Sequence, residues 1–280
     1  MSTPLVLIGD EVTDLPDSYL TGHGVYEDDG KVFVARVGTL VHIEKLVYVK
    51  ALHSRYEATV GDVVIGRVAE IQSNRWMLDI QGSQRGQLPL GSVWIPGTEQ
   101  RIKTDSDQFK MREHFQESDL VLCEVQRVQQ DNQSVSLHTR SSRYGRLENG
   151  CLTIVPCELV PSQEKHMELY PNGVYVILGR NGYIWTGSPP IESEEDALNS
   201  AVHEAHVYRE VTRDLRVPII RTRNCIRLLA DHQVAINKKN ILALCALSVN
   251  EDLPVARLLD PCVGHGLVRR ALHVSNSVPS

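Results

Sequence analysis

The chain has 280 residues, of which 42% are hydrophobic and 23% charged, and its formal net charge is −6. These values are typical of an ordinary globular protein with room for two or three domains. No apolar run approaches the length of a membrane span, and the amino terminus lacks the basic start of a secretory signal. Because free-standing nucleic-acid binders are usually basic, this net charge counts against a protein that binds nucleic acid alone over its whole surface; any such contact would come from local patches or from a surface shared with partners.

The six cysteines form no C-x-x-C pair, so we expect reduced thiols in an intracellular protein and no metal site. The sequence contains no P-loop, no nucleophile elbow and no clustered acidic metal site. His23 lies between two glycines, a context typical of turns, and His265 lies between two glycines in a different local context, so we assign neither histidine a catalytic role. The sequence therefore offers no candidate for a catalytic residue or a cofactor site.

Residues 1–58 alternate between apolar and polar positions, with glycines at the expected turns. Alternation with a period of two indicates strands. We predict a small N-terminal β domain of three to five short strands.

Residues 59–142 carry the clearest pattern in the chain. They begin with GDVVIGRV, and apolar side chains then recur at every second position, as in Trp76, Leu78 and Ile80. The pattern predicts five short strands that form a small closed barrel of the oligonucleotide-binding (OB) class. The run resembles an S1 RNA-binding domain.

Side-chain direction decides which barrel residues can reach RNA. If Trp76 faces inward, its neighbours Arg75 and Met77 face outward, because adjacent strand residues point to opposite sides. Typical S1 domains carry exposed aromatic residues, on which bases stack, at the two positions that Met77 and Gln87 occupy in this chain. Because neither residue has an aromatic ring, we expect base stacking to be largely missing there. Contacts would then be mainly to phosphates.

A polar insertion, residues 91–119, interrupts the barrel, and we expect a short helix over 107–115. A compact basic stretch follows the last barrel strand. The candidate RNA-binding residues are Arg75, Arg85, His138, Arg140, Arg143 and Arg146. Ordinary surface charge is the alternative interpretation.

The region 148–272 combines strands with helices. A β-hairpin is expected over 173–187, helices over 209–232 and 254–259, and a strand over 241–247. Pro218 argues for two helical pieces in the first of these. Residues 273–280 are expected to be a disordered tail.

Three stretches together resemble one family. They are residues 9–26, residues 135–145 and the run Ile177–Trp185, which contains Gly179, Arg180, Asn181 and Gly182. Their order and spacing are similar to those of the ribosomal-RNA-processing protein 4 family, a cap subunit of the eukaryotic RNA exosome. The resemblance implies a mainly β protein with an α+β C-terminal part: an N-terminal β domain, an S1 barrel and a KH-type α/β domain.

The resemblance places the KH signature at Gly179–Gly182. An ordinary KH domain holds its G-x-x-G loop between two helices and clamps phosphates there. Here the flanking residues alternate like strands, and Asn181-Gly182 favours a tight turn in which Asn181 takes positive φ. We therefore expect a structural turn that packs against the S1 barrel. RNA clamping is the alternative.

The resemblance also implies a function without enzymatic activity, since a cap subunit needs no active site of its own. Cap proteins sit on a ring of RNase PH-like subunits and guide single-stranded RNA into a central channel for 3′-to-5′ processing and decay, including rRNA maturation. Expected partners are ring subunits, other cap subunits, associated exonucleases and RNA, with no membrane. The expected location is the nucleus, including the nucleolus, and the cytoplasm.

Two rival hypotheses remain open. The first is a free-standing S1/KH protein that binds single-stranded RNA outside an exosome. The second is a nuclease, for which the barrel region offers only scattered carboxylates: Asp62, Asp79, Asp119 and Asp131. RNA substrates and the nuclease that would supply activity are not predicted by the sequence.

Overall fold

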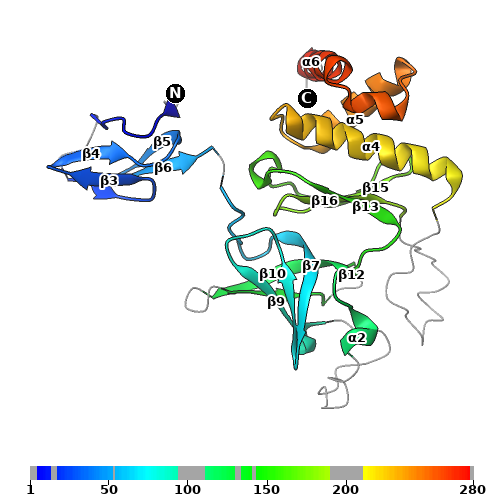
Figure 1. Ribbon diagram of the computed structural model, residues 1–280, viewed down its shortest axis with the longest axis horizontal. Helices are drawn as coiled ribbons and strands as arrows, with labels where there is room; N and C mark the ends of the chain where they lie inside the picture. The colour runs from blue at the N-terminus through cyan, green and yellow to red at the C-terminus, as the bar shows by residue number, and fades with distance from the viewer. Residues whose placement is uncertain are drawn as a thin grey trace. The chain divides into compact units, whose positions relative to one another are not determined.

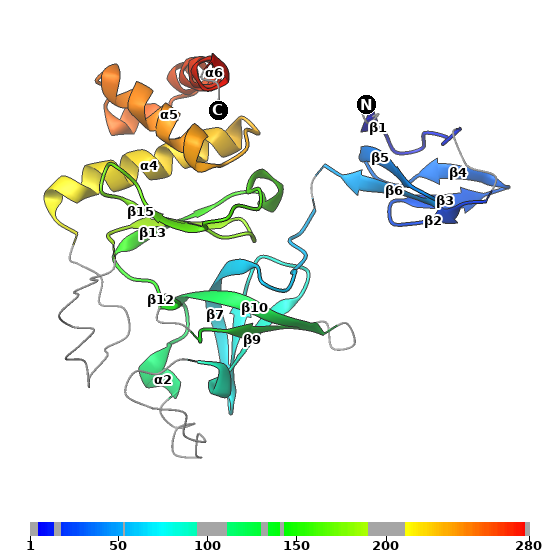
Figure 2. The same ribbon diagram turned by 180° about the vertical axis from the view of Figure 1, so that it is seen from behind.

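The computed structural model describes residues 5–13, 18–52, 54–93, 111–129, 134–140, 143–189 and 211–277. The chain divides into two compact units, Met1–Ser54 and Arg55–Ser280, which are drawn in Figures 1 and 2. The division falls between Ser54 and Arg55 rather than after residue 58. Within the described ranges, no helix has both the length and the apolar character needed to cross a membrane.

The first unit is built from short strands around a small valine-rich core. Its strands are β1 (Leu5–Val6), β2 (Leu20–Thr21), β3 (Val25–Asp28), β4 (Lys31–Val34), β5 (Gly38–Ile43) and β6 (Leu46–Ala51). One sheet has the order β1-β5-β6-β2, and β3 and β4 form a separate hairpin. The core includes Val32, Val34 and Val47, which are fully buried. The described residues thus hold one strand more than the upper limit expected from the sequence.

The second unit begins with the predicted five-stranded barrel. Its strands are β7 (Val63–Gln72), β8 (Arg75–Asp79), β9 (Arg85–Pro89), β10 (Leu120–Gln129) and β11 (Ser134–His138). They follow the order β11-β9-β8-β7-β10, and a further β10–β11 pairing closes the barrel. The S1-like barrel is confirmed.

The inward side chains of the barrel follow the alternation in the sequence. Trp76, Leu78 and Ile80 are all buried, and the Trp76 indole donates a hydrogen bond of 3.2 Å to the Phe115 carbonyl. Phe115 follows α2 (Met111–His114), the described part of the helix expected over 107–115. Residues 107–110 lie outside the described residues. The 3-10 turn η1 (Leu90–Ser92) follows β9.

Beyond the barrel, a second sheet carries the helices. Strand β12 (Gly145–Arg146) pairs with β10. The second sheet consists of β13 (Gly150–Ile154), β14 (Met167–Leu169), β15 (Tyr175–Leu178) and β16 (Tyr183–Gly187). Its order is β13-β16-β15-β14, with antiparallel neighbours. The hairpin expected over 173–187 is confirmed as β15–β16, and the 3-10 turn η2 (Cys157–Leu159) lies between β13 and β14.

The C-terminal helices differ from expectation at three points. The helices are α4 (Arg213–Asp231), α5 (Lys238–Asn250) and α6 (Pro261–Ser277), with the 3-10 helix η3 (Val255–Leu259) before α6. Helix α4 continues through Pro218, so the prediction of two pieces is wrong. Helix α5 replaces the strand expected over 241–247. Helix α6 runs to Ser277, so the predicted disordered tail begins too early.

The second sheet lies between the barrel and the helices (Figure 1). On one side, Ile177 and Trp185 join an apolar cluster with barrel residues Ile65 and Leu122. On the other side, the alternate residues of β15 and β16 pack with α4, α5 and α6. Because both faces are covered, every residue of β16 is buried. We call the contact between the barrel and the second sheet the seam, and apolar residues of both, including Ile65, Leu122 and Trp185, form its core.

Candidate nucleic-acid interface

One group of predicted residues lies on the outer face of β8 and β9. Arg75 and Arg85 are exposed, and the Arg75 guanidinium donates a hydrogen bond of 2.9 Å to the Gln87 side chain. Gln87 also lies opposite Ser136 of β11 in the parallel β9–β11 register. The three strands thus share a polar outer surface on which Arg75 and Arg85 carry the positive charge.

Met77 does not face solvent as predicted, since only 8% of it is exposed. It lies between Glu70 and Gln87 in the strand register, and side chains directly opposite on neighbouring strands share a face. The long stems of such neighbours can cover an unbranched side chain. Neither Met77 nor Gln87 supplies a ring on which a base could stack.

A second group lies where β10 meets β11. His138 is the antiparallel partner of Glu124, so both side chains project from the same outer face. The Tyr144 hydroxyl donates a hydrogen bond of 2.6 Å to Glu124. The His138 and Tyr144 rings meet edge to face with centroids 6.3 Å apart. Arg140 is exposed and lies close enough to His138 to act on its pKa.

Burial and the neighbouring charges decide the protonation of this group. Burial lowers the pKa of His138 from its ordinary value, the Arg140 charge lowers it further, and the Glu124 carboxylate opposes them. His138 is therefore mainly neutral at pH 7. Burial, together with the hydrogen bond to Glu124, raises the pKa of Tyr144, so its hydroxyl stays a donor. Arg140 is the permanent cation of the group.

The last two predicted residues have different surroundings. Arg146 forms ion pairs with Asp119 at 3.3 Å and Glu148 at 3.1 Å. These two carboxylates already compensate its charge, so less of that charge is available to a phosphate. Arg143 is exposed on the segment that leads to β12.

The KH-signature residues lie in the β15–β16 turn. The Gly182 amide donates to the Gly179 carbonyl at 3.0 Å, and the Gly179 amide donates to Tyr183 at 3.0 Å. Gly182 has a φ of +82°, whereas Asn181 is absent from the described residues with positive φ. The expectation that Asn181 takes positive φ is therefore wrong. The turn has three loop residues followed by a left-handed glycine, which supplies the reversal.

Asn181 lies against the barrel, and the expected packing of the turn on the barrel is confirmed. Its side chain is fully buried, and its amide donates to the carbonyls of Ile65 at 2.7 Å and Ile80 at 2.9 Å. Its side-chain oxygen accepts from the Ile65 amide at 3.4 Å. One side chain thus joins the turn to two barrel segments more than a hundred residues away in sequence.

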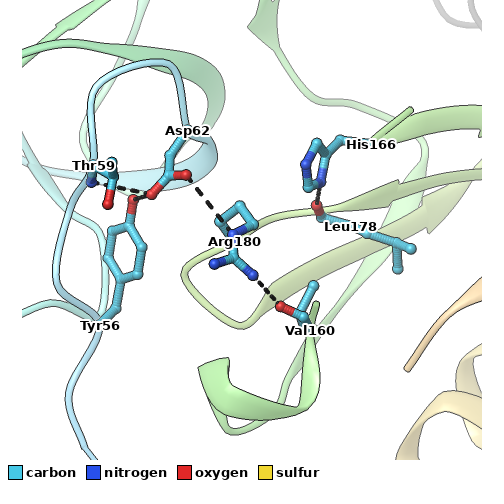
Figure 3. A network of polar contacts seen from close by, with 7 residues as sticks. All are labelled: Tyr56, Thr59, Asp62, Val160, His166, Leu178 and Arg180. Atoms are coloured by element: carbon cyan, nitrogen blue, oxygen red, sulfur yellow. Dashed lines mark hydrogen bonds and ion pairs between the residues drawn. The ribbon is translucent and has the colours of Figure 1, made fainter. Parts of the chain in front are cut away.

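Arg180, the neighbouring turn residue, extends this connection (Figure 3). Its guanidinium lies 3.7 Å from Asp62 and donates to the Val160 carbonyl. Asp62 in turn accepts hydrogen bonds from the Tyr56 hydroxyl at 2.7 Å and the Thr59 amide at 3.1 Å. Burial, with Asp62 beside it, raises the pKa of Tyr56. The segment that leads into β7, which contains Tyr56, Thr59 and Asp62, therefore shares one polar network with the β15–β16 turn.

The structure thus places the predicted residues in two surface groups, Arg75 with Arg85 and His138 with Arg140, and places the KH-signature turn in the seam between barrel and second sheet. The contact of Tyr144 with Glu124 and His138 was not predicted, because its partners are 20 and 6 residues away on other strands. Cross-strand contacts of this kind carry no local periodic signal. Among the described residues, no group of three or more His, Cys, Asp or Glu side chains is arranged to hold a metal ion.

Comparison with known proteins identifies the family. Residues 55–127 match the model of the RRP4 S1 domain. The chain is 39% identical over 236 residues to the "Exosome complex component RRP4 homolog" of Caenorhabditis elegans. The matched region covers 84% of this chain and 76% of that protein. It is 35% identical over 268 residues to the Schizosaccharomyces pombe "Exosome complex component rrp4", covering 91% and 80%. It is 38% identical over 238 residues to the Bos taurus "Exosome complex component RRP4", covering 85% and 79%. The chain therefore belongs to the RRP4 family of exosome complex components.

Proposed function

We propose that this chain is a non-catalytic, RNA-binding subunit of an exosome complex that guides single-stranded RNA toward catalytic subunits. The observation that carries the proposal is the similarity to proteins named exosome complex components over 84% or more of the chain. The exposed arginines of the barrel support it, because arginine is well suited to phosphate contacts.

The proposal includes an assembly. The chain would act as a cap protein on a ring of RNase PH-like subunits, beside other cap subunits and associated exonucleases, in the nucleus, the nucleolus and the cytoplasm. It would take part there in 3′-to-5′ processing and decay of RNA, including rRNA maturation. An overall charge of −6 is easier to understand in a subunit than in a protein that binds RNA alone.

A free-standing RNA-binding protein is the alternative, since exposed Arg75 and Arg85 would serve a protein acting alone equally well. Mass spectrometry of material that copurifies with the tagged chain at moderate salt separates the two. The exosome proposal predicts ring subunits in stoichiometric amounts and weak RNA binding by the isolated chain. Recovery of a monomer that binds RNA tightly would support the alternative.

The RNA path over the barrel is tested by reversing three charges together, with R75E, R85E and R140E in one variant. Among the described residues, none of these three arginines forms an ion pair with an acidic side chain. If each contacts one phosphate, the slope of log affinity against log salt should fall by about 2 for single-stranded RNA. RNA crosslinking and decay by the reconstituted complex should weaken, while assembly stays intact.

The matched control reverses three exposed arginines of α4, with R213E, R216E and R227E. This variant has the same charge change but leaves the barrel untouched. It should retain wild-type RNA crosslinking and salt dependence. Equal loss in both variants would mean that net charge, rather than the barrel face, governs RNA entry.

A further inference from the structure

The outer face of the barrel has aromatic rings at an unexpected place. The positions of Met77 and Gln87 offer none, but His138 and Tyr144 form an edge-to-face pair, with centroids 6.3 Å apart and planes at 84°. The pair lies on the outer face of the β10–β11 pairing, because His138 ends β11 and is the register partner of Glu124 in β10.

We propose that this ring pair is a stacking site for one nucleobase of single-stranded RNA, with Arg140 holding an adjacent phosphate. The inference rests on the proposed RNA-binding function and assigns a chemical role to each side chain. His138 offers the stacking surface, Tyr144 supports it from behind, and Glu124 fixes Tyr144 through its hydroxyl.

Tyr144 is held rigidly enough to support such a site. Its ring packs against the apolar cluster at the seam between barrel and second sheet, which includes Leu122 and Leu147. Its hydroxyl is bound to Glu124 at 2.6 Å. A ring fixed at both ends loses little conformational freedom when a ligand binds, so more of the contact free energy contributes to affinity.

His138 carries a hydrogen-bonding atom that the described part of the chain leaves unused. Its side chain is partly exposed. Its Nδ1 atom is buried without a hydrogen-bond partner in the described part of the chain, an arrangement that costs folding free energy. A buried polar atom without a partner calls for an explanation, and a bound ligand is the one that the proposal supplies.

The charges around the rings separate base from backbone. Neutral His138 is suited to contact a base face rather than to neutralise a phosphate. Glu124 repels phosphates from the rings, and Arg140 attracts them two residues further along the chain. An RNA strand that crosses the outer face of the β10–β11 pairing would therefore place one base on His138 and an adjacent phosphate on Arg140.

The test uses the full-length chain and a fluorescent 12-nucleotide oligouridylate, titrated at several salt concentrations. His138→Ala should raise Kd by about fivefold to a hundredfold, because one stacking contact is lost. The salt slope should stay at the wild-type value, because no phosphate contact is removed. His138→Phe should bind within about twofold of wild type, since it keeps a ring.

Arg140→Gln provides the opposite signature. It should weaken binding and also lower the salt slope by about 0.7, the effect of one phosphate contact. Thermal melting of each variant checks its fold. Crosslinking of the wild-type chain with a 4-thiouridine-containing oligonucleotide gives a reading independent of any substitution, and should label His138 or Tyr144.

Two results would overturn the inference while the proposed function stands. Wild-type affinity in folded His138→Ala, or crosslinks confined to Arg75, Arg85 and their neighbours, would place the bases elsewhere on the barrel. Absence of RNA binding by the wild-type chain, both alone and in the reconstituted complex, would overturn the proposed function and the inference together.

Discussion

At the residue scale, the role of Asn181 differs from the role that its local sequence predicts. Asn181 is read from sequence as a turn residue, yet it is a buried amide with three hydrogen bonds to the barrel backbone. Its neighbour Gly182 supplies the positive φ, and a Cβ there would collide with the Val155 carbonyl. Local sequence chemistry predicts that a turn occurs, but the packing decides which residue bears the unusual conformation.

Asn181 offers a direct test of the seam. Asn181→Ala would leave the amide and carbonyl of Ile65 and the carbonyl of Ile80 without this partner, and each buried unsatisfied group costs about 1–3 kcal/mol. We expect a loss of about 2–4 kcal/mol in the free energy of unfolding, measured by urea denaturation. Asn74→Ala, at an exposed turn position, is the control and should change stability by less than about 0.5 kcal/mol. Equal stability of both variants would show that the Asn181 contacts are dispensable.

At the element scale, the errors of sequence interpretation arise where short apolar runs fit either strand or helix. The run over 241–247 has no breaker within it, and a strand is a reasonable prediction. In the structure, Ile241, Leu244, Cys245 and Ser248 are buried at helical spacing. The Asn237 side chain caps the helix by accepting from the Asn240 amide at 2.8 Å. Asn237 lies just before the apolar run, so an interpretation based on the run alone does not include this helix-capping residue.

Helix α4 gives a prediction of its own. Pro218 lies inside a continuous helix, where it has no amide to donate to the carbonyl four residues earlier, that of Asp214. Pro218→Ala restores that donor and should raise the free energy of unfolding by about 1–3 kcal/mol. Val217→Ala, at a neighbouring position with 51% exposure, should change it by less than about 0.5 kcal/mol. A lower melting temperature for Pro218→Ala would mean that the proline ring makes packing contacts that outweigh the missing bond.

At the scale of the whole molecule, the boundary between the units has a physical basis in Tyr56. This side chain is 5% exposed, packs in the barrel core and donates to Asp62. It therefore belongs to the second unit, although alternation alone places the end of the first domain at residue 58. The barrel and the KH-type sheet, by contrast, share one apolar seam and one polar network, so they form one compact unit rather than two.

Two truncations test this boundary. A fragment of residues 55–280 should unfold cooperatively at the melting temperature of the corresponding transition in the full chain, measured by differential scanning calorimetry. A fragment of residues 59–280 lacks Tyr56 and should melt about 6–12 °C lower, because removal of a buried aromatic side chain costs about 3–5 kcal/mol. Identical melting temperatures for the two fragments would place the boundary beyond Tyr56.

The sequence by itself determined the barrel, the β15–β16 hairpin and the helical character of residues 213–231, because alternation, turn residues and helical spacing are local properties of the chain. It also determined the family, through motifs in a fixed order. Only the tertiary structure decided that Met77 is buried, that Arg146 is paired, that Asn181 joins turn to barrel, and that His138 meets Tyr144 and Glu124. Each of these depends on partners from distant segments, and strand register and packing, which bring such segments together, are set by the fold as a whole.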